Sequence, residues 1–175
     1  RRKGLRLTDH SKFFVCPEQY PVPLQDLWSE FLSAIPKHQV SAMITFGSFP
    51  AGDFFYTTHE NQVYMVSDFE LALVSEPHFT PDTRAALSQA VHRFNMSHHK
   101  FHLGFNANVR LSTPTDYRDR IRTDTLFASS LLSTGATAWG DPVFLAAARE
   151  QQAEMVTTAS DALDFFDALL DELII

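Results

Sequence analysis

The hydrophobic positions near the start of the chain recur at helical spacing. Residues three or four apart lie on one face of an α-helix, so this repeat predicts a helix that packs on a core. The segment 23–36 shows it and ends at a proline, with Leu24, Leu27, Trp28, Phe31, Leu32 and Ile35 as its apolar positions. The same periodicity predicts further helices over residues 81–94, 115–133, 143–152 and 160–173.

Other segments are typical of β-strands. Residues 39–46 and 63–74 are short and mostly apolar, and residues 137–142 form a brief extended piece followed by a turn. Residues 100–111 alternate between apolar and polar positions, which is the period of a strand. Because the predicted helices and strands alternate, the expected fold class is α/β (α+β), with a mixed sheet flanked by helices and further helices at the C-terminal end.

The length of the chain fits one domain with a small appendage. Its 175 residues are 45% apolar, which is enough for one well-filled core. We expect a core domain over residues 1–140, including an N-terminal extension, and a helical appendage over residues 141–175. No apolar run approaches the roughly 20 residues that cross a bilayer, and no apolar stretch typical of a signal peptide follows the basic start.

Net charge and cysteine content limit the classes of binding partner and the cellular compartments that are expected for this chain. The formal net charge of −7 argues against a surface for long nucleic acids, because neutralising their phosphates requires clustered Lys and Arg. The only cysteine, Cys16, excludes an intramolecular disulfide and is typical of a reducing compartment. We therefore expect a cytoplasmic protein without membrane association, and we interpret Cys16 as chemically inert.

Two acids lie two residues apart in the predicted strand 63–74. Side chains at positions i and i+2 of a strand project from the same face, so Asp68 and Glu70 are expected side by side while Phe69 and Leu71 point into the core. Adjacent carboxylates repel each other unless a cation lies between them, which predicts a site for a hard divalent metal such as Mg²⁺. The alternative is a strand with one solvated face.

A Gly-Ser pair ends the preceding predicted strand. A glycine at this point lets backbone N–H groups approach a ligand closely, which suits the binding of a phosphate. Gly47 and Ser48 are therefore candidates for a phosphate-binding turn opposite the two acids.

Together these residues resemble the nucleotidyltransferase superfamily, which includes DNA polymerase beta, the aminoglycoside nucleotidyltransferases and the minimal nucleotidyltransferases. The family pattern is a Gly-Ser near the start of a helix, commonly followed by a small residue and a glycine, and then a Ser-Asp-x-Asp/Glu-Leu strand. The matching residues here are Gly47, Ser48, Ala51, Gly52, Ser67, Asp68, Glu70 and Leu71, and the resemblance extends over residues 40–140.

The resemblance implies a role for each part of the motif. Gly47, Ser48 and Ser67 are expected to contact a nucleoside triphosphate, with ATP as the first candidate. Asp68 and Glu70 are expected to be the catalytic pair that coordinates Mg²⁺.

The third carboxylate that family members usually carry on a later strand has no counterpart between residues 100 and 111. Asn106 or Asn108 stands where this acid is expected, and an amide oxygen can ligate a metal but cannot act as a base. Asn106 and Arg110 remain candidates for binding the nucleotide. Whether Asp53, Glu60 or Asp116 replaces the missing acid is left open by the sequence.

Three other features leave alternatives open. The segment from Ser48 to Ser67 is longer than in compact family members, and its Phe54, Phe55 and Tyr56 either stack on a base or pin the loop to the core. The arginines after residue 109 either bind an acidic ligand or form a solvated face. Four histidines lie close together in the sequence without the spacing of a zinc signature: His92, His98, His99 and His102. They either bind a metal, lie on the surface or, in the case of His102, face the nucleotide.

The expected reaction is transfer of a nucleoside monophosphate from an NTP to a hydroxyl of a small molecule or protein, with Mg²⁺ as cofactor. The missing acid favours an alternative, a catalytically silent nucleotidyltransferase-like module that binds nucleotide or a partner protein. A purely structural interaction domain would require the motif to be accidental. The apolar face of the segment 160–173 is the expected docking face for a protein partner, if it does not pack on the core.

Overall fold

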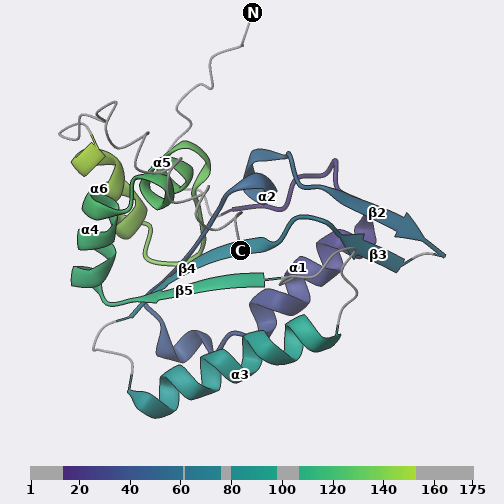
Figure 1. Ribbon diagram of the computed structural model, residues 1–175, viewed down its shortest axis with the longest axis horizontal. Helices are drawn as coiled ribbons and strands as arrows, with labels where there is room; N and C mark the ends of the chain where they lie inside the picture. Colours follow the sequence, from purple (N-terminus) through teal and green to yellow (C-terminus); the bar gives the residue numbers. More distant parts are fainter. Residues whose placement is uncertain (1–13, 61, 76–79, 98–106, 153–175) are drawn as a thin grey trace, which may run out of the picture.

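A mixed sheet of four strands lies at the centre of the molecule (Figure 1). Its spatial order is β5-β4-β1-β6, and the strands are β1 (Ala42–Phe46), β4 (Phe69–Val74), β5 (Ala107–Ser112) and β6 (Ala136–Gly140). β1 is antiparallel to both β4 and β6, whereas β4 and β5 run parallel. The computed structural model describes residues 14–60, 62–75, 80–97 and 107–152.

Two helices cover one face of the sheet: α1 (Val22–Ala34) and α3 (Pro81–Ser97). The apolar stripe expected over residues 23–36 is present, because Leu24, Trp28 and Phe31 are buried. The helix ends one residue before Ile35, and a short 3₁₀ helix, η1 (Lys37–Gln39), leads into β1. The strand expected over residues 39–46 therefore begins three residues later, at Ala42.

Aromatic side chains fill this face. Phe69 of β4 stacks on Phe31 and on Phe54, with ring centroids 5.8 and 5.2 Å apart, and meets Trp28 edge-on at 5.2 Å. Each fully buried side chain of this size contributes about 1.5–3 kcal/mol, and aromatic pairs add about 0.5–1.5 kcal/mol. This aromatic cluster is the main apolar core of the described chain.

Three helices cover the opposite face: α4 (Pro114–Thr123), α5 (Thr125–Thr134) and α6 (Val143–Gln152). The prediction of one helix over residues 115–133 is wrong, because the helix is interrupted at Asp124. This residue has non-helical dihedrals, and its side chain accepts a hydrogen bond from the backbone N–H of Phe127 at 2.9 Å. Asp124 thus caps the start of α5, the position that short acceptor side chains favour.

The single strand expected over residues 63–74 is also wrong. The chain first forms a separate hairpin from β2 (Tyr56–His59) and β3 (Gln62–Met65), and β4 begins only at Phe69. The N–H groups of Val66 and Ser67 both donate to the Phe55 carbonyl at 3.0 Å. Two residues facing one form a bulge, which bends the chain away from the hairpin and ends the regular pairing just before Asp68.

Two predicted elements lie partly or wholly outside the described residues. The strand expected over residues 100–111 is described from Ala107 onward and continues to Ser112. The helix expected over residues 160–173, with its docking face, lies outside the described residues, and the domain boundary at residue 140 stays a prediction. Among the helices that the structure describes, none combines the length and apolar character that spanning a bilayer demands.

The fold class expected from the sequence is confirmed. A four-stranded sheet with parallel and antiparallel neighbours is flanked by helices on both faces. The face covered by α4, α5 and α6 carries the candidate site, because its apolar side chains give way to polar ones where β1 ends and where β4 and β5 begin.

Candidate functional site

The site begins with a row of three side chains across the sheet. Phe46 at the end of β1 pairs with Glu70 of β4, and Glu70 pairs with Asn108 of β5. Paired residues of neighbouring strands project from the same face, so all three lie on the face covered by α5. Phe46 is buried there, Glu70 is half-buried and Asn108 is exposed. The row therefore runs from the core to the solvent.

Gly47 and Glu70 are in direct contact. A Cβ added to Gly47 would overlap the Glu70 carboxylate and lie 2.9 Å from its Cδ atom. Gly47 also has φ 79° and ψ −150°, a backbone conformation that is essentially restricted to glycine. Glycine at this position is thus required both by the backbone and by the space that Glu70 occupies.

Asp68 lies immediately before β4, two residues from Glu70. The pKa of Glu70 is raised above its usual range, first by burial of the carboxyl and then by the negative charge of Asp68, while Arg110 opposes the shift. Within the described ranges, neither acid forms a salt bridge. The two carboxylates thus repel each other, Arg110 offsets that repulsion only in part, and their hard oxygen donors fit a divalent cation such as Mg²⁺.

The Gly-Ser turn is held from helix α5. The backbone N–H of Gly47 donates to the Thr134 hydroxyl at 2.8 Å, and that hydroxyl donates to the Ser130 carbonyl. Gly47 therefore uses its N–H inside the protein, so any contact of Gly47 with a phosphate has to come from its close backbone approach. Ser48 follows Gly47 in the sequence and begins the short helix α2 (Ser48–Ala51).

Ser67 closes the base of the hairpin. Its hydroxyl accepts a hydrogen bond from the backbone N–H of Phe55 at 3.1 Å, and its own N–H donates to the Phe55 carbonyl. These contacts give Ser67 a structural role at the bulge, and the nucleotide contact expected for it stays a prediction.

Arg110 brings the positive charge of the site. It lies on β5 next to Ala72, on the same face as Glu70 and Asn108. Its Nη1 donates to Asp124 Oδ2 at 3.2 Å, and its guanidinium carbon lies 5.1 Å from the centre of the Phe127 ring. Asp124 and Thr134 are therefore at the two ends of α5, and both hold a residue of the site.

Asn108 lies on β5 at a position where a third acid is expected. The parallel pairing places this amide beside Glu70, and no group of three acids, cysteines or histidines that could hold a metal is found in the described part of the chain. Asp116, one of the candidate replacements, instead caps α4 by accepting from the N–H of Thr113. Asn106 lies outside the described residues.

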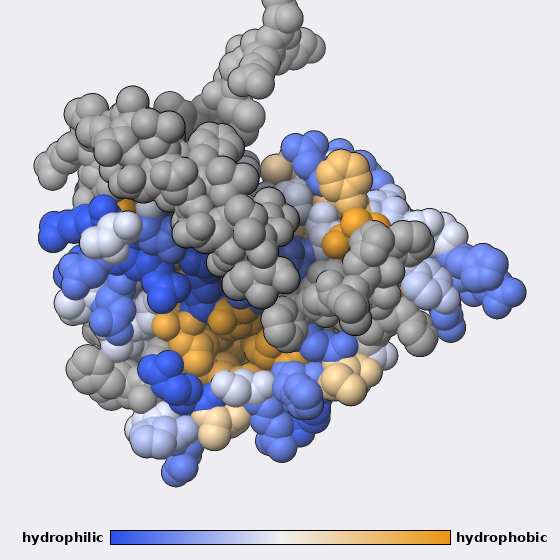
Figure 2. All heavy atoms as spheres, viewed as in Figure 1, coloured by the Kyte–Doolittle hydropathy of each residue, from blue (hydrophilic) through white to orange (hydrophobic). Residues whose placement is uncertain are grey.

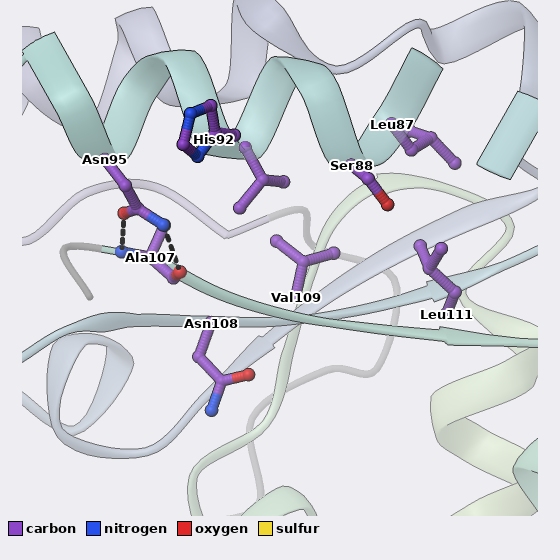
Figure 3. A pocket seen from close by; sticks show the side chains of 9 residues that line it. Leu87, Ser88, His92, Asn95, Ala107, Asn108, Val109 and Leu111 are labelled. Atoms are coloured by element: carbon purple, nitrogen blue, oxygen red, sulfur yellow. Dashed lines mark hydrogen bonds between the residues drawn. The ribbon is translucent and has the colours of Figure 1, made fainter. Parts of the chain in front are cut away.

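A hollow among the described residues lies behind the site. It is a groove of about 290 Å³ between α3 and β5, and Figure 2 shows apolar side chains gathered in it. Figure 3 shows Val109 and Leu111 pointing toward α3 while Asn108 points to the other side of β5. Asn95 lines one end and bonds both backbone groups of Ala107. The groove thus belongs to the face opposite Glu70.

The remaining alternatives are settled in part. Phe54 is buried against Phe69 and Tyr20, so this ring pins the loop to the core, whereas Phe55 is exposed. Among the clustered histidines only His92 is described, and it lies exposed on the rim of the groove. His98, His99 and His102 lie outside the described residues.

Comparisons with known proteins find only distant matches, all of them among solved structures. No protein-family model matches the chain, and no curated protein matches it. Among solved structures, a chain of a toxin–antitoxin complex with AMP-PNP is 14% identical, with 86% of this chain and 98% of that chain covered at a TM-score of 0.41. A chain of the MntA–HepT toxin–antitoxin complex is 10% identical, with 86% and 99% covered and a TM-score of 0.41.

A third match comes from Shewanella oneidensis. It is a chain of the complex between a tri-AMPylated HEPN toxin and the MNT antitoxin, 11% identical, with 86% of this chain and 95% of that chain covered and a TM-score of 0.38. These likenesses describe the course of the backbone, and the function of this chain is inferred from its own residues.

Two residues of the site escape prediction from the sequence alone. Asp124 carries a usable signal, because an aspartate between two threonines inside a predicted helix is typical of a cap and hence of a helix break. Thr134 carries none, since its contact with Gly47 joins residues 87 positions apart.

Proposed function

We propose that this chain is a nucleotidyltransferase-like domain that binds a nucleoside triphosphate with Mg²⁺ and transfers its nucleoside monophosphate to a hydroxyl group. The observation that carries the proposal is the contact of the Glu70 carboxylate with Gly47, next to Asp68. Two neighbouring carboxylates beside a glycine turn, which form no salt bridge with the described residues, are costly to maintain, and a nucleotide-bound metal would relieve that cost.

Each residue has a defined task in this reaction. Asp68 and Glu70 would hold Mg²⁺, which when bound neutralises charge on the phosphates. Gly47 and Ser48 leave room for the phosphates beside this pair, and Arg110 attracts them. The acceptor oxygen attacks the α-phosphorus, the bond to pyrophosphate breaks, and the hydroxyl proton passes to solvent, because the Asn108 amide cannot accept it.

A catalytically silent module is the second candidate. It keeps the nucleotide site but does not transfer, and the specific observation in its favour is the neutral amide of Asn108 beside Glu70. Such a module would bind ATP or a related nucleotide and present the bound state to a partner protein. For an active domain, the net charge of −7 favours a small molecule or a protein as the acceptor.

Calorimetry with ATP and Mg²⁺ tests the site itself. The Asp68→Asn, Glu70→Gln double variant removes both charges and preserves side-chain size, so we expect Mg²⁺-dependent ATP binding to weaken by at least about 100-fold, the loss of two charge-assisted contacts. The matched control, Asp119→Asn with Glu150→Gln, removes the same charge from exposed positions of α4 and α6. Wild-type protein that does not bind ATP with Mg²⁺ contradicts the proposal.

Pyrophosphate release separates the two candidates. We expect wild-type protein to release pyrophosphate from ATP slowly when an acceptor hydroxyl is present, and the Asn108→Asp variant to release it at least about tenfold faster, since a positioned base contributes about 10²–10⁴-fold. Asn108→Leu is the control for loss of the amide itself. Tight ATP binding without pyrophosphate release in wild type and in Asn108→Asp supports the silent module.

A further inference from the structure

Arg110 is placed on the face of the sheet where a bound phosphate would lie. The parallel register of β4 and β5 sets it one step beyond Asn108, which is the direct neighbour of Glu70. Both β5 side chains therefore project from the face that carries Glu70. The positive charge of Arg110 is close enough to stabilise the ionised form of Glu70.

The guanidinium is fixed by two neighbours from α5. Asp124 Oδ2 accepts from its Nη1 at 3.2 Å, and its guanidinium carbon lies over the ring of Phe127, 5.1 Å from the ring centre. Asp124 is itself fixed, because its other oxygen accepts from the Phe127 N–H at 2.9 Å. A carboxylate held at one oxygen and bonded to arginine at the other leaves the guanidinium little freedom of rotation.

This arrangement leaves donors available. A guanidinium carries a planar fork of N–H groups, and the structure assigns only one hydrogen bond of Arg110 to a protein acceptor within the described residues. The Arg110 side chain is 29% exposed, so its other donors can reach a ligand. A planar, pre-oriented fork matches phosphate oxygens in a way that a flexible lysine does not.

We infer that Asp124 is a positioning residue, which holds Arg110 in the orientation that binds the phosphates of a nucleotide. The inference rests on the proposed nucleotide site and adds to it a residue that the motif does not contain. The competing explanation is that the pair only ties β5 to the junction of α4 and α5. The two differ in whether Asp124 matters for phosphate affinity and whether it acts through Arg110.

A double-mutant cycle on ATP binding in the presence of Mg²⁺ decides between them. Arg110→Ala should weaken ATP binding by about 30-fold and Asp124→Ser by about tenfold, the scale of one charge-assisted contact. Serine still caps α5 but is too short to hold the guanidinium. Because Asp124 acts through Arg110, the double variant should bind no more weakly than Arg110→Ala alone.

The controls separate phosphate binding from fold stability. Thr113→Ala removes the cap of the adjacent helix α4, leaves the Arg110 contacts in place and should keep wild-type ATP affinity. Any affinity for adenosine, which lacks phosphates, should not change in any of the variants. If Asp124→Ser does not fold, Asp124→Asn carries the test, because asparagine keeps the cap and the side-chain size and loses only the charge.

Three results overturn the inference alone: ATP affinity unchanged in Asp124→Ser, an equal further loss in the Arg110→Ala background, or a parallel loss of adenosine binding. In each of these cases the wild-type protein still binds ATP with Mg²⁺, so the proposed function stands. Wild-type protein that binds no ATP overturns the proposed function and this inference with it.

Discussion

The two faces of the sheet differ in how completely they are filled. The face under α1 and α3 is occupied by aromatic rings, with Phe69 at their centre. The face under α4, α5 and α6 is apolar only over part of its length and ends in Glu70 and Asn108. Stability and chemistry are thus assigned to different sides of the same strands, and residues 69 and 70 point to opposite sides.

The sharpest test of this separation is Phe69→Ala. Removing a fully buried ring from the aromatic cluster should lower the free energy of unfolding by about 3–5 kcal/mol, measured by urea denaturation. The Asp68→Asn, Glu70→Gln variant should lose ATP binding and none of this stability. If the acid-free variant unfolds as readily as Phe69→Ala, the two faces are not independent.

A substitution of Gly47 should lower both the stability of the protein and its affinity for ATP. Gly47→Ala forces a side chain into a backbone conformation that costs about 1–3 kcal/mol and displaces the Glu70 carboxylate, so both stability and ATP affinity should fall. The control is Gly52→Ala, which also has positive φ but whose added Cβ would meet only the end of Gln19. Equal ATP affinity in the two variants would show that Glu70 does not need its place beside Gly47.

The Glu70 carboxyl should make the folded protein less stable as pH rises. Because the folded-state pKa of Glu70 is raised, this group favours the folded state below its unfolded pKa, and that contribution is lost as pH rises through the folded value. Glu70→Gln should remove the loss and, without nucleotide, stabilise the protein at pH 7 by up to about 1 kcal/mol after allowance for partial exposure. Parallel stability profiles of the two proteins from pH 4 to 8 would refute the assignment.

The smallest effect concerns the filled face. Cys16 packs against the aromatic cluster, and burial raises the pKa of its thiol to about 11. Since the thiolate is the reactive form, a thiol reagent at pH 8 should modify it at least about tenfold more slowly than a free cysteine. Modification should reach the free-cysteine rate in urea, and an equally fast reaction in the folded protein would show that the face is open there.

The filled face is largely predictable from sequence because its determinants are local. The helical spacing from Leu24 to Ile35 identifies α1, and the alternation of Phe69 and Leu71 with Glu70 identifies the buried side of β4. Both patterns need only a few consecutive residues and a known period. Their ends are less certain because capping and bulges, such as the one at Ser67, interrupt a period without changing the apolar content.

The site is only half predictable for the same reason. The motif names Gly47, Asp68 and Glu70, and the pairing of β1 with β4 brings Gly47 next to Glu70. The residues that hold the site in place come from α5. The sequence does not fix the interruption of the helix at Asp124, and it does not reveal the contact of Thr134 with Gly47. Contacts between segments far apart depend on tertiary packing, which a single sequence does not reveal.

Helix α5 has a mechanical consequence. Asp124, which caps the start of this helix, binds Arg110, and Thr134 at its end binds the backbone N–H of Gly47. If the helix moved along its axis as a rigid body, both contacts would shift by the same distance and in the same direction. The positions of Arg110 and of Gly47 are therefore coupled through a single helix, and a displacement of that helix would change both.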